Sequence, residues 1–299
     1  MNGWIIYNGA LRIKKVEKLV YELFEKAKKK NVKLQLVRNN EILPSFDSYG
    51  KAQLNSTINL SNPDFIIFWD KDIYLARHLE LMGYTLFNSR EAIELCDNKS
   101  LMHLKLANLN IRIPKTIVGP FVFQQQNLNE DYIDFIFSHL GNKVIIKESY
   151  GSFGMQVYLV NNKNEFKDKV MQLQNRSFIV QEFIETSFGR DIRVNIIGDE
   201  IVGAMQRTSS ADFRTNITLG GIGKFIDLSD EQKEMALKAH KALNLDFSGI
   251  DLLFGTNDEP ILCEVNSNVN FLSFEEISNI DFGDKLIDYV ITRIKWKHY

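Results

Sequence analysis

Cysteine is scarce in this sequence, and its scarcity excludes two classes of protein. The chain has 299 residues and two cysteines, Cys96 and Cys263, both in apolar surroundings. Two isolated cysteines form neither the framework of a disulfide-stabilised domain nor the ligand set of a structural zinc site. Histidine is also infrequent, with five residues, and we find no Ser-His-Asp or Cys-His arrangement that predicts a side-chain nucleophile.

Long apolar runs and an excess of charge of one sign are lacking as well. Runs such as 65–69 have the length of a strand, far short of the ~20 residues that a membrane helix needs. The first residues do not combine a basic segment, an apolar stretch and a cleavage site, so we expect a cytoplasmic protein without a membrane partner. The net charge of −2 gives no reason to expect a nucleic-acid partner.

The order of the expected strands and helices predicts more than one structural unit. Residues 1–95 alternate between strand and helix patterns, which favours a small α/β domain with a parallel sheet. A single helix is expected over 89–109, with Ser89 as its N-cap. The remainder consists mainly of strands in hairpins, including 190–207 and 248–266, which is typical of an α+β arrangement with antiparallel strands.

The last hairpin places carboxylates inside apolar strands. Folding it about residues 257–258 brings Leu253 opposite Leu262 and Asp251 opposite Glu264, and strand alternation adds Asn266 to the same face. Cys263 is expected on the opposite face. No basic residue is expected on the carboxylate face, and two adjacent carboxylates repel each other, so this face predicts a site for a divalent cation with oxygen ligands. The alternative is a solvated sheet face.

Two further segments have the residue types of an anion site. In "KESYGSFGM", Lys147 ends a strand, and the glycines of the following loop let its backbone approach phosphate oxygens closely. A plain hairpin turn is the alternative interpretation. Asp191 and Arg193 share one face of the next hairpin, Arg207 ends its second strand, and Arg214 follows in a polar loop. Converging arginines suit a multiply anionic substrate, with surface ion pairs as the alternative.

Taken in order, these stretches resemble the ATP-grasp superfamily, and within it the RimK-like amino-acid ligases, over about residues 90–275. The resemblance implies an α/β N-terminal domain (1–95), a linker helix with the central ATP-grasp lobe (96–186), and a C-terminal ATP-grasp lobe with the metal site (187–299). The two ATP-grasp lobes would clasp ATP. The implied cofactor is Mg²⁺, two ions being expected, with Mn²⁺ as a substitute.

The resemblance also implies a role for individual residues. It places Arg193 and Arg214 at the reacting groups and Asp251, Glu264 and Asn266 on the metal. It places Arg207, Ser267 and Asn268 at the substrate, with Arg207 free to bind a substrate carboxylate. The implied nucleotide contacts are Lys99, Lys147, Gly151, Ser152, Gln181, Glu182, Phe183, Ile184, Asp191 (on the ribose), Thr215 and Asn216.

The implied activity is ATP-dependent ligation of a carboxylate to an amine through an acylphosphate, with glutamate or another amino acid as substrate and a small molecule or peptide as acceptor. Two alternatives stay open. One is a ligase that forms amide or ester crosslinks in a ribosomal peptide, and the other is a nucleotide-binding regulatory protein without turnover. After Asn266 the chain reads "SNVNF", where close RimK relatives have small residues and a proline-glycine turn, so the substrate is not fixed by the resemblance. A homo-oligomer is compatible with the sequence.

Overall fold

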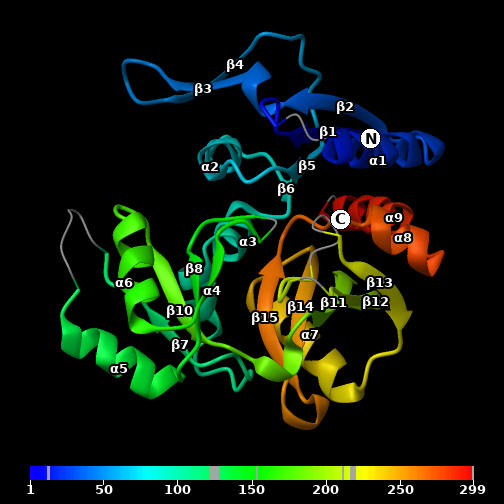
Figure 1. Cartoon of the computed structure of the whole chain (residues 1–299). Helices are drawn as coiled ribbons and strands as arrows, with labels where there is room; N and C mark the ends of the chain where they lie inside the picture. The colour runs from blue at the N-terminus through cyan, green and yellow to red at the C-terminus, as the bar shows by residue number, and fades with distance from the viewer. Residues whose placement is uncertain (12–13, 122–127, 153, 211, 216–219, 298–299) are drawn as a thin grey trace.

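The computed structural model describes residues 1–11, 14–121, 128–152, 154–210, 212–215 and 220–297, arranged around three larger sheets and one hairpin (Figure 1). The N-terminal sheet lies at one end of the molecule, and the other two sheets lie side by side at the opposite end. Within the described residues, no helix is both long enough and apolar enough to cross a membrane.

The N-terminal sheet confirms the predicted parallel β/α unit. Its four strands pair in the order β2-β1-β5-β6, all parallel. The hairpin of β3 and β4, which projects from this unit, was missed because Pro44 interrupts its first strand and its second strand has no β-branched or aromatic residue. The elements are β1 (Asn2–Tyr7), α1 (Lys14–Lys29), β2 (Lys33–Arg38), β3 (Ile42–Phe46), β4 (Ala52–Ser56), β5 (Phe65–Trp69), α2 (Ile73–Leu81) and β6 (Leu86–Phe87).

The helix expected over 89–109 is wrong as a single element, because the chain forms two helices. α3 (Arg90–Asp97) follows the predicted cap Ser89, and one residue separates α3 from α4 (Lys99–Leu106). Asn98 separates them with φ −101° and ψ 103°, and its side chain accepts from the backbone of Leu101. Asn98 thus ends α3 and is the N-cap of α4, so the chain changes direction before Lys99.

The central sheet is antiparallel, with the strand order β7-β10-β8-β9. Helices α5 and α6 cover one face, and their apolar side chains form a separate core with the strands. The elements are β7 (Thr116–Val118), α5 (Glu130–Leu140), β8 (Val144–Glu148), β9 (Val157–Val160), α6 (Lys163–Gln172) and β10 (Phe178–Glu182).

The C-terminal sheet has five antiparallel strands in the order β13-β12-β11-β14-β15, as the hairpins predicted. Helices α3, α4 and α7 pack on one face, so the linker helices share their core with this sheet. The elements are β11 (Arg190–Ile197), β12 (Glu200–Thr208), β13 (Ile222–Ile226), α7 (Asp230–Ala242), β14 (Phe247–Phe254), β15 (Pro260–Asn266), α8 (Leu272–Ser278) and α9 (Phe282–Lys297).

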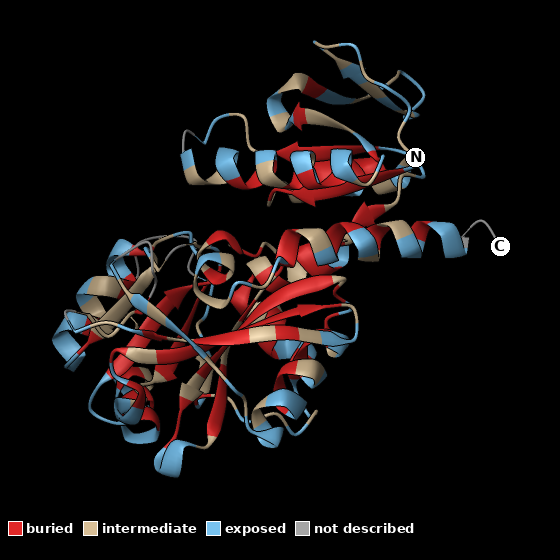
Figure 2. Cartoon of the chain, turned by 90° about the vertical axis from the view of Figure 1, so that its right-hand side faces the viewer, coloured by how far each residue is buried: buried red, intermediate tan, exposed pale blue. Residues whose placement is uncertain are grey.

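One continuous core joins the N-terminal unit to the C-terminal sheet. α9 lies between them in both views, and its inner face is buried together with strands of both sheets (Figures 1 and 2). Trp69 stacks on Phe247 at 5.2 Å between ring centroids and meets Phe271 edge-on at 6.0 Å. Phe271 in turn stacks on Phe282 of α9. These aromatic contacts make residues distant in sequence parts of one packing unit.

A buried amide connects the same two parts through the backbone. Asn88, which follows β6, donates from its Nδ2 to the carbonyls of Phe247 and Ser267 at 3.0 and 2.9 Å. Its Oδ1 accepts from the backbone N–H groups of Asp246 and Phe247. All hydrogen-bonding positions of this amide are thereby used, which fixes the end of β6 against the starts of β14 and of the loop after β15.

We predict that the N-terminal unit and the C-terminal sheet unfold together. Phe282→Ala removes a fully buried ring from the shared core and should lower the free energy of unfolding by about 3–5 kcal/mol. Trp296→Ala, on the exposed side of the same helix, should change it by about 0.5 kcal/mol or less. Urea unfolding followed by tryptophan fluorescence and circular dichroism measures both. Two separate unfolding transitions, of which Phe282→Ala shifts only the one that belongs to the C-terminal sheet, would contradict the shared core.

Candidate functional site

The carboxylate face of the last hairpin forms, but with a different register from the predicted one. Asp251 lies opposite Glu264 as expected, whereas Leu262 pairs with Leu252 instead of Leu253. The extra residue is accommodated by a β-bulge between these pairs, which leaves Cys263 without a partner in the ladder. The bulge turns Cys263 to the carboxylate face, where its Sγ lies 3.5 Å from the Nζ of Lys147, so its expected place on the opposite face is wrong.

Basic residues accompany the carboxylates, contrary to the expectation that this face has none. Arg193 binds Asp251 through two hydrogen bonds, from Nε to Oδ1 at 2.5 Å and from Nη2 to Oδ2 at 2.8 Å. Lys99 Nζ lies 3.3 Å from Glu264 Oε1. Protein cations therefore already balance both carboxylates, and like-charge repulsion alone does not require a metal ion here.

Arg207 links the two halves of this ion network. Its Nε and Nη2 donate to Asp191 at 2.8 and 2.5 Å, and Nη2 also lies 2.8 Å from Asp251 Oδ1. The side chain is 6% exposed. Burial lowers the pKa of Arg207, but the carboxylates of Asp251 and Asp191 outweigh it and raise the pKa. The expectation of a free Arg207 guanidinium is wrong, since the neighbouring carboxylates already bind it.

The two lysines reach the carboxylate face from different elements. Lys147 is the fourth residue of β8, whose burial is complete along its length. Lys99 opens α4, and its backbone N–H donates to the carbonyl of Ser149 just after β8. The helix break at Asn98 thus aligns Lys99 with the end of β8, and both ammonium groups lie beside Glu264. Burial raises the pKa of Glu264, but Lys99 and Lys147 reverse this effect and hold the pKa below its usual range.

Asn266 completes the set of oxygen donors at this face. Its Nδ2 lies 3.5 Å from Asp251 Oδ2 and 3.4 Å from the carbonyl of Gly249, while its Oδ1 has no partner among the described residues. Glu264 is 28% exposed at its side chain. A carboxylate and an amide oxygen that remain accessible suit a hard cation such as Mg²⁺. Where the structure is described, no cluster of three His, Cys, Asp or Glu side chains forms a ready metal site.

The glycine loop is connected to the C-terminal sheet by Arg214. Nη1 of Arg214 donates to the carbonyl of Gly154 at 2.8 Å, and its other nitrogens bind Asp212. Gly154 has φ +74°, a conformation that glycine adopts without strain. In the same loop the N–H of Ser152 donates to Gln156 Oε1, and a Cβ on Gly151 would lie 2.7 Å from that oxygen. Phe153 lies outside the described residues, as does the expected nucleotide contact Asn216.

The segment expected to bind adenine follows β10 at the base of the central lobe. The N–H of Glu182 donates to the carbonyl of Lys115, and the carbonyl of Ile184 accepts from Ser187. The Phe183 ring meets Phe188 and Phe213 edge-on. The N–H groups of Phe183 and Ile184 have no backbone partner within the described chain, so the segment offers these two donors to a ligand.

His103 is a site residue that sequence reasoning missed. Its Nε2 lies 3.1 Å from Gln181 Nε2, and Gln181 also donates to Thr116 Oγ1. Burial and the nearby Lys147 lower the pKa of His103 to about 4, so it is neutral near neutral pH. The signal was its spacing, because residues 99 and 103 are four apart on one helix and face the same side.

The remaining expected contacts are arranged as follows. Thr215 is buried next to Arg214. Ser267 is buried, and its carbonyl accepts from Asn88. The Oδ1 of Asn268 is buried, and no described residue forms a hydrogen bond with it. The contacts therefore bring together Lys99, Lys147, Asp191, Arg193, Arg207, Asp251, Glu264 and Asn266, and place Arg214 at the glycine loop.

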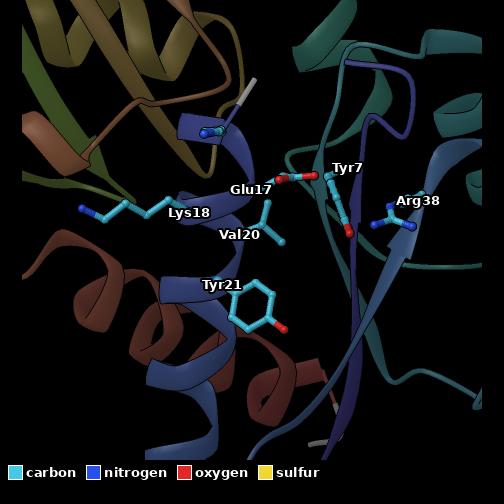
Figure 3. Close-up of a pocket in the computed structure, with 7 residues that line it drawn as sticks. Tyr7, Glu17, Lys18, Val20, Tyr21 and Arg38 are labelled. Carbon is cyan, nitrogen blue, oxygen red and sulfur yellow. The ribbon is translucent and has the colours of Figure 1, made fainter. Parts of the chain in front are cut away.

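A separate pocket of about 330 Å³ opens in the N-terminal unit between α1 and the ends of β1 and β2. Figure 3 shows Glu17 pointing toward Tyr7, while Lys18 points away from Arg38. Because these cationic groups diverge, they do not form a common anion site. The pocket shares no lining residue with the ion network.

The sequence is similar to a known family of proteins. The model of the RimK-like ATP-grasp domain matches residues 96–290. The chain belongs to the RimK-like ATP-grasp family. Lys99 of α4, Lys147 of the central lobe and the carboxylates of the C-terminal sheet all lie inside the matched region.

Two curated relatives and one solved structure illustrate the likeness. The uncharacterized protein MG012 of Mycoplasma genitalium is 31% identical over 92% of this chain and 99% of its own length. Human N-acetylaspartylglutamate synthase A is 31% identical over 80% of this chain and 63% of its own length. The ATP-grasp ligase PsnB, solved with a minimal precursor, Mg and ADP, covers 98% of both chains with a TM-score of 0.69 and 16% identity. PsnB is thus similar in fold.

We predict that Arg207 stabilises the fold by neutralising buried carboxylates. Arg207→Met should lower the free energy of unfolding by about 3–5 kcal/mol, because Asp191 loses its charged partner inside the protein. Lys224→Met, at an exposed position of the adjacent strand β13, should change it by about 0.5 kcal/mol or less. Adding Asp191→Asn to Arg207→Met should recover part of the loss. Equal stabilities of the two single variants would disprove the buried pairing.

Proposed function

We propose that this protein is an ATP-dependent ligase that joins a carboxylate to an amine through an acylphosphate, with glutamate as the amine. The observation that carries the proposal is the convergence of Lys99, Lys147 and Arg193 on the face that holds Glu264 and Asp251. Cationic donors there suit a triphosphate and a transferred phosphoryl group, and the adjacent oxygen donors suit its magnesium. Membership of the RimK-like family supports the reaction class.

The amine assignment is supported by the name of one relative. Human N-acetylaspartylglutamate synthase A makes, by its name, a product that contains glutamate. The alignment covers 63% of that enzyme and 80% of this chain. The carboxylate substrate is a separate small acid or peptide.

In the proposed reaction, each part of the site has a physical task. Lys99 and Lys147 hold the ATP phosphates together with the backbone N–H groups of Gly151 and Ser152, and residues 181–184 bind adenine. Glu264 and Asn266 would hold Mg²⁺, and Asp251 would join them by exchanging a hydrogen bond from Arg193. The bound ion would neutralise charge on the ATP phosphates. Arg193 stabilises the oxyanion that forms when the amine attacks the acylphosphate and phosphate leaves. No side-chain nucleophile is needed, which agrees with the residues present.

Two assignments are changed by the contacts in the structure. Asp191 and Arg207 bind each other inside the sheet, so we propose that they position Asp251 and Arg193 and do not bind ribose or substrate directly. Arg214 binds the carbonyl of Gly154. We therefore propose that Arg214 holds the glycine loop over the nucleotide and reaches the transferred phosphoryl group when that loop moves.

A hydroxylamine trap tests the acylphosphate. With ATP, Mg²⁺ and a panel of carboxylic acids and short peptides, the wild-type protein should form a hydroxamate from its true acid substrate and release ADP. Glu264→Gln should lower the rate at least roughly a hundredfold, since even outer ligands of metal sites are worth 10–100-fold. Glu259→Gln, which removes an exposed carboxylate near the start of the same strand, should leave it unchanged. Near-normal ADP formation by Glu264→Gln at limiting magnesium would refute the metal assignment.

Cys263 gives an independent measure of where the nucleotide lies. Its Sγ touches Lys147, whereas Cys96 is buried in an apolar core. Burial raises the pKa of both thiols, so alkylation by N-ethylmaleimide should be slow, and mass spectrometry should find it at Cys263. ATP with Mg²⁺ should slow it further, because phosphates bound by Lys147 cover the thiol. Unchanged labelling at saturating nucleotide would remove Lys147 from the phosphate site, and Cys263→Ser serves as the control for the labelled position.

A further inference from the structure

Asp70 is a buried carboxylate that lacks a partner for one of its oxygens. It follows β5 and is 7% exposed. Its Oδ1 accepts from the backbone N–H of Lys71 at 2.7 Å and from Asn8 Nδ2 at 3.3 Å. Its Oδ2 is buried and has no hydrogen-bond partner in the part of the chain that the structure describes. A buried carboxylate oxygen without a partner is unfavourable, so a ligand that supplies a donor would bind there with a net gain.

The position of Asp70 in the sheet is one where ligands bind. The parallel sheet has the order β2-β1-β5-β6, so the chain leaves β1 toward one edge and later returns to the other side of β1. Asn8 and Asp70 follow these two central strands at their carboxyl ends, and their side chains meet across the gap. Ligands of open parallel sheets bind outside the carboxyl ends of the strands at this point of divergence.

The same edge of the sheet faces the ion network of the C-terminal lobe. Trp69, the residue before Asp70, packs on Phe271 in the segment that follows Asn266. Lys71, the residue after Asp70, pairs with Asp97 and helps to lower the pKa of Glu264, after the larger effects of burial, Lys99, Asp251 and Lys147. Asp70 therefore lies on the side of the N-terminal unit that is turned toward the metal-ligand candidates.

No cation of the described chain neutralises Asp70. The nearest ammonium in sequence, that of Lys71, is held by Asp97. Asp72 caps α2 by accepting from Leu75, and it adds a second negative charge. Burial raises the pKa of the Asp70 carboxyl, which agrees with the lack of a cationic partner. The group that fits this oxygen is thus a small cation with hydrogen-bond donors.

We propose that Asp70 binds the ammonium group of the amine substrate through Oδ2. This inference rests on the proposed ligase function and names the residue that recognises the amine. The ammonium group supplies the charge and the donors that Asp70 lacks. Asp70 then selects an amino acid over an acid of the same shape without the amine, and it holds the nitrogen at the edge of the N-terminal sheet, opposite the face that holds Glu264.

Paired ligands that differ in one group test the assignment. Binding of L-glutamate and of glutarate, which lacks the amine, is measured by calorimetry with a non-hydrolysable ATP analogue and Mg²⁺ present. The wild-type protein should prefer glutamate by roughly ten- to a hundredfold, the worth of a hydrogen bond to a charged group. Asp70→Asn should bind the two ligands equally. Asp64→Asn, at the opposite end of β5, should keep the wild-type preference.

Stability provides a check on the variant itself. Asp70→Asn keeps the side-chain volume and the acceptor Oδ1, and it removes a buried charge, so the variant should melt at or above the wild-type temperature. Asp70→Ala replaces it in the same binding comparison if Asp70→Asn does not fold. A variant that folds and still prefers glutamate over glutarate overturns the proposal.

The outcomes separate this inference from the proposed function. If no standard amino acid binds the wild-type protein more tightly than its deaminated analogue, the assignment of Asp70 is overturned. ATP-dependent hydroxamate formation would still support the ligase in that case, because hydroxylamine bypasses the amine site. Conversely, a preference that Asp70→Asn abolishes would support the amine site even if no acid gave a hydroxamate.

Discussion

The candidate site depends on a guanidinium that is shared by two buried carboxylates. Arg207 of β12 binds Asp191 of β11 and Asp251 of β14, so one side chain spans three neighbouring strands. Charges this deeply buried are tolerated because each has an opposite partner at hydrogen-bond distance. The pairing also fixes Asp251 in the orientation that lets Arg193 bind both of its oxygens. The geometry of the carboxylate face is therefore determined from within the sheet, before any ligand is bound.

Much of the architecture could be predicted because it depends on local patterns. The helix cap at Ser89, the parallel strands of the N-terminal unit, and the hairpins within 190–207 and 248–266 were all confirmed. The likeness to a known family gave the order of the site segments. The pairing of Asp251 with Glu264 was also predicted from the hairpin, although the predicted register of the neighbouring pair, Leu253 with Leu262, was wrong.

The errors have a common physical origin in contacts between distant residues. A bulge adds one residue to β15 and reverses the side of Cys263, and strand alternation cannot reveal such an insertion. The partners of Arg207 and Glu264 lie 16 to 165 residues away in the sequence. The sequence alone therefore suggested that some arginines were unpaired and free to bind a substrate. His103 was overlooked for the same reason, since its neighbour Gln181 comes from another lobe. The unpaired oxygen of Asp70 became visible only in the folded structure, where none of the described residues supplies it with a donor.

The amide of Asn88 has a consequence for how substrates enter. It is bonded to β14 and to the loop after β15 at once, and the aromatic core around Trp69 lies beside it. The N-terminal unit and the C-terminal sheet are therefore expected to behave as one rigid body. The central lobe has its own core, and one of its contacts with the rest is the hydrogen bond from Arg214 to Gly154. In the proposed ligase, opening of the site would then take place between this rigid body and the central lobe, where Lys147 of β8 meets Cys263 of β15.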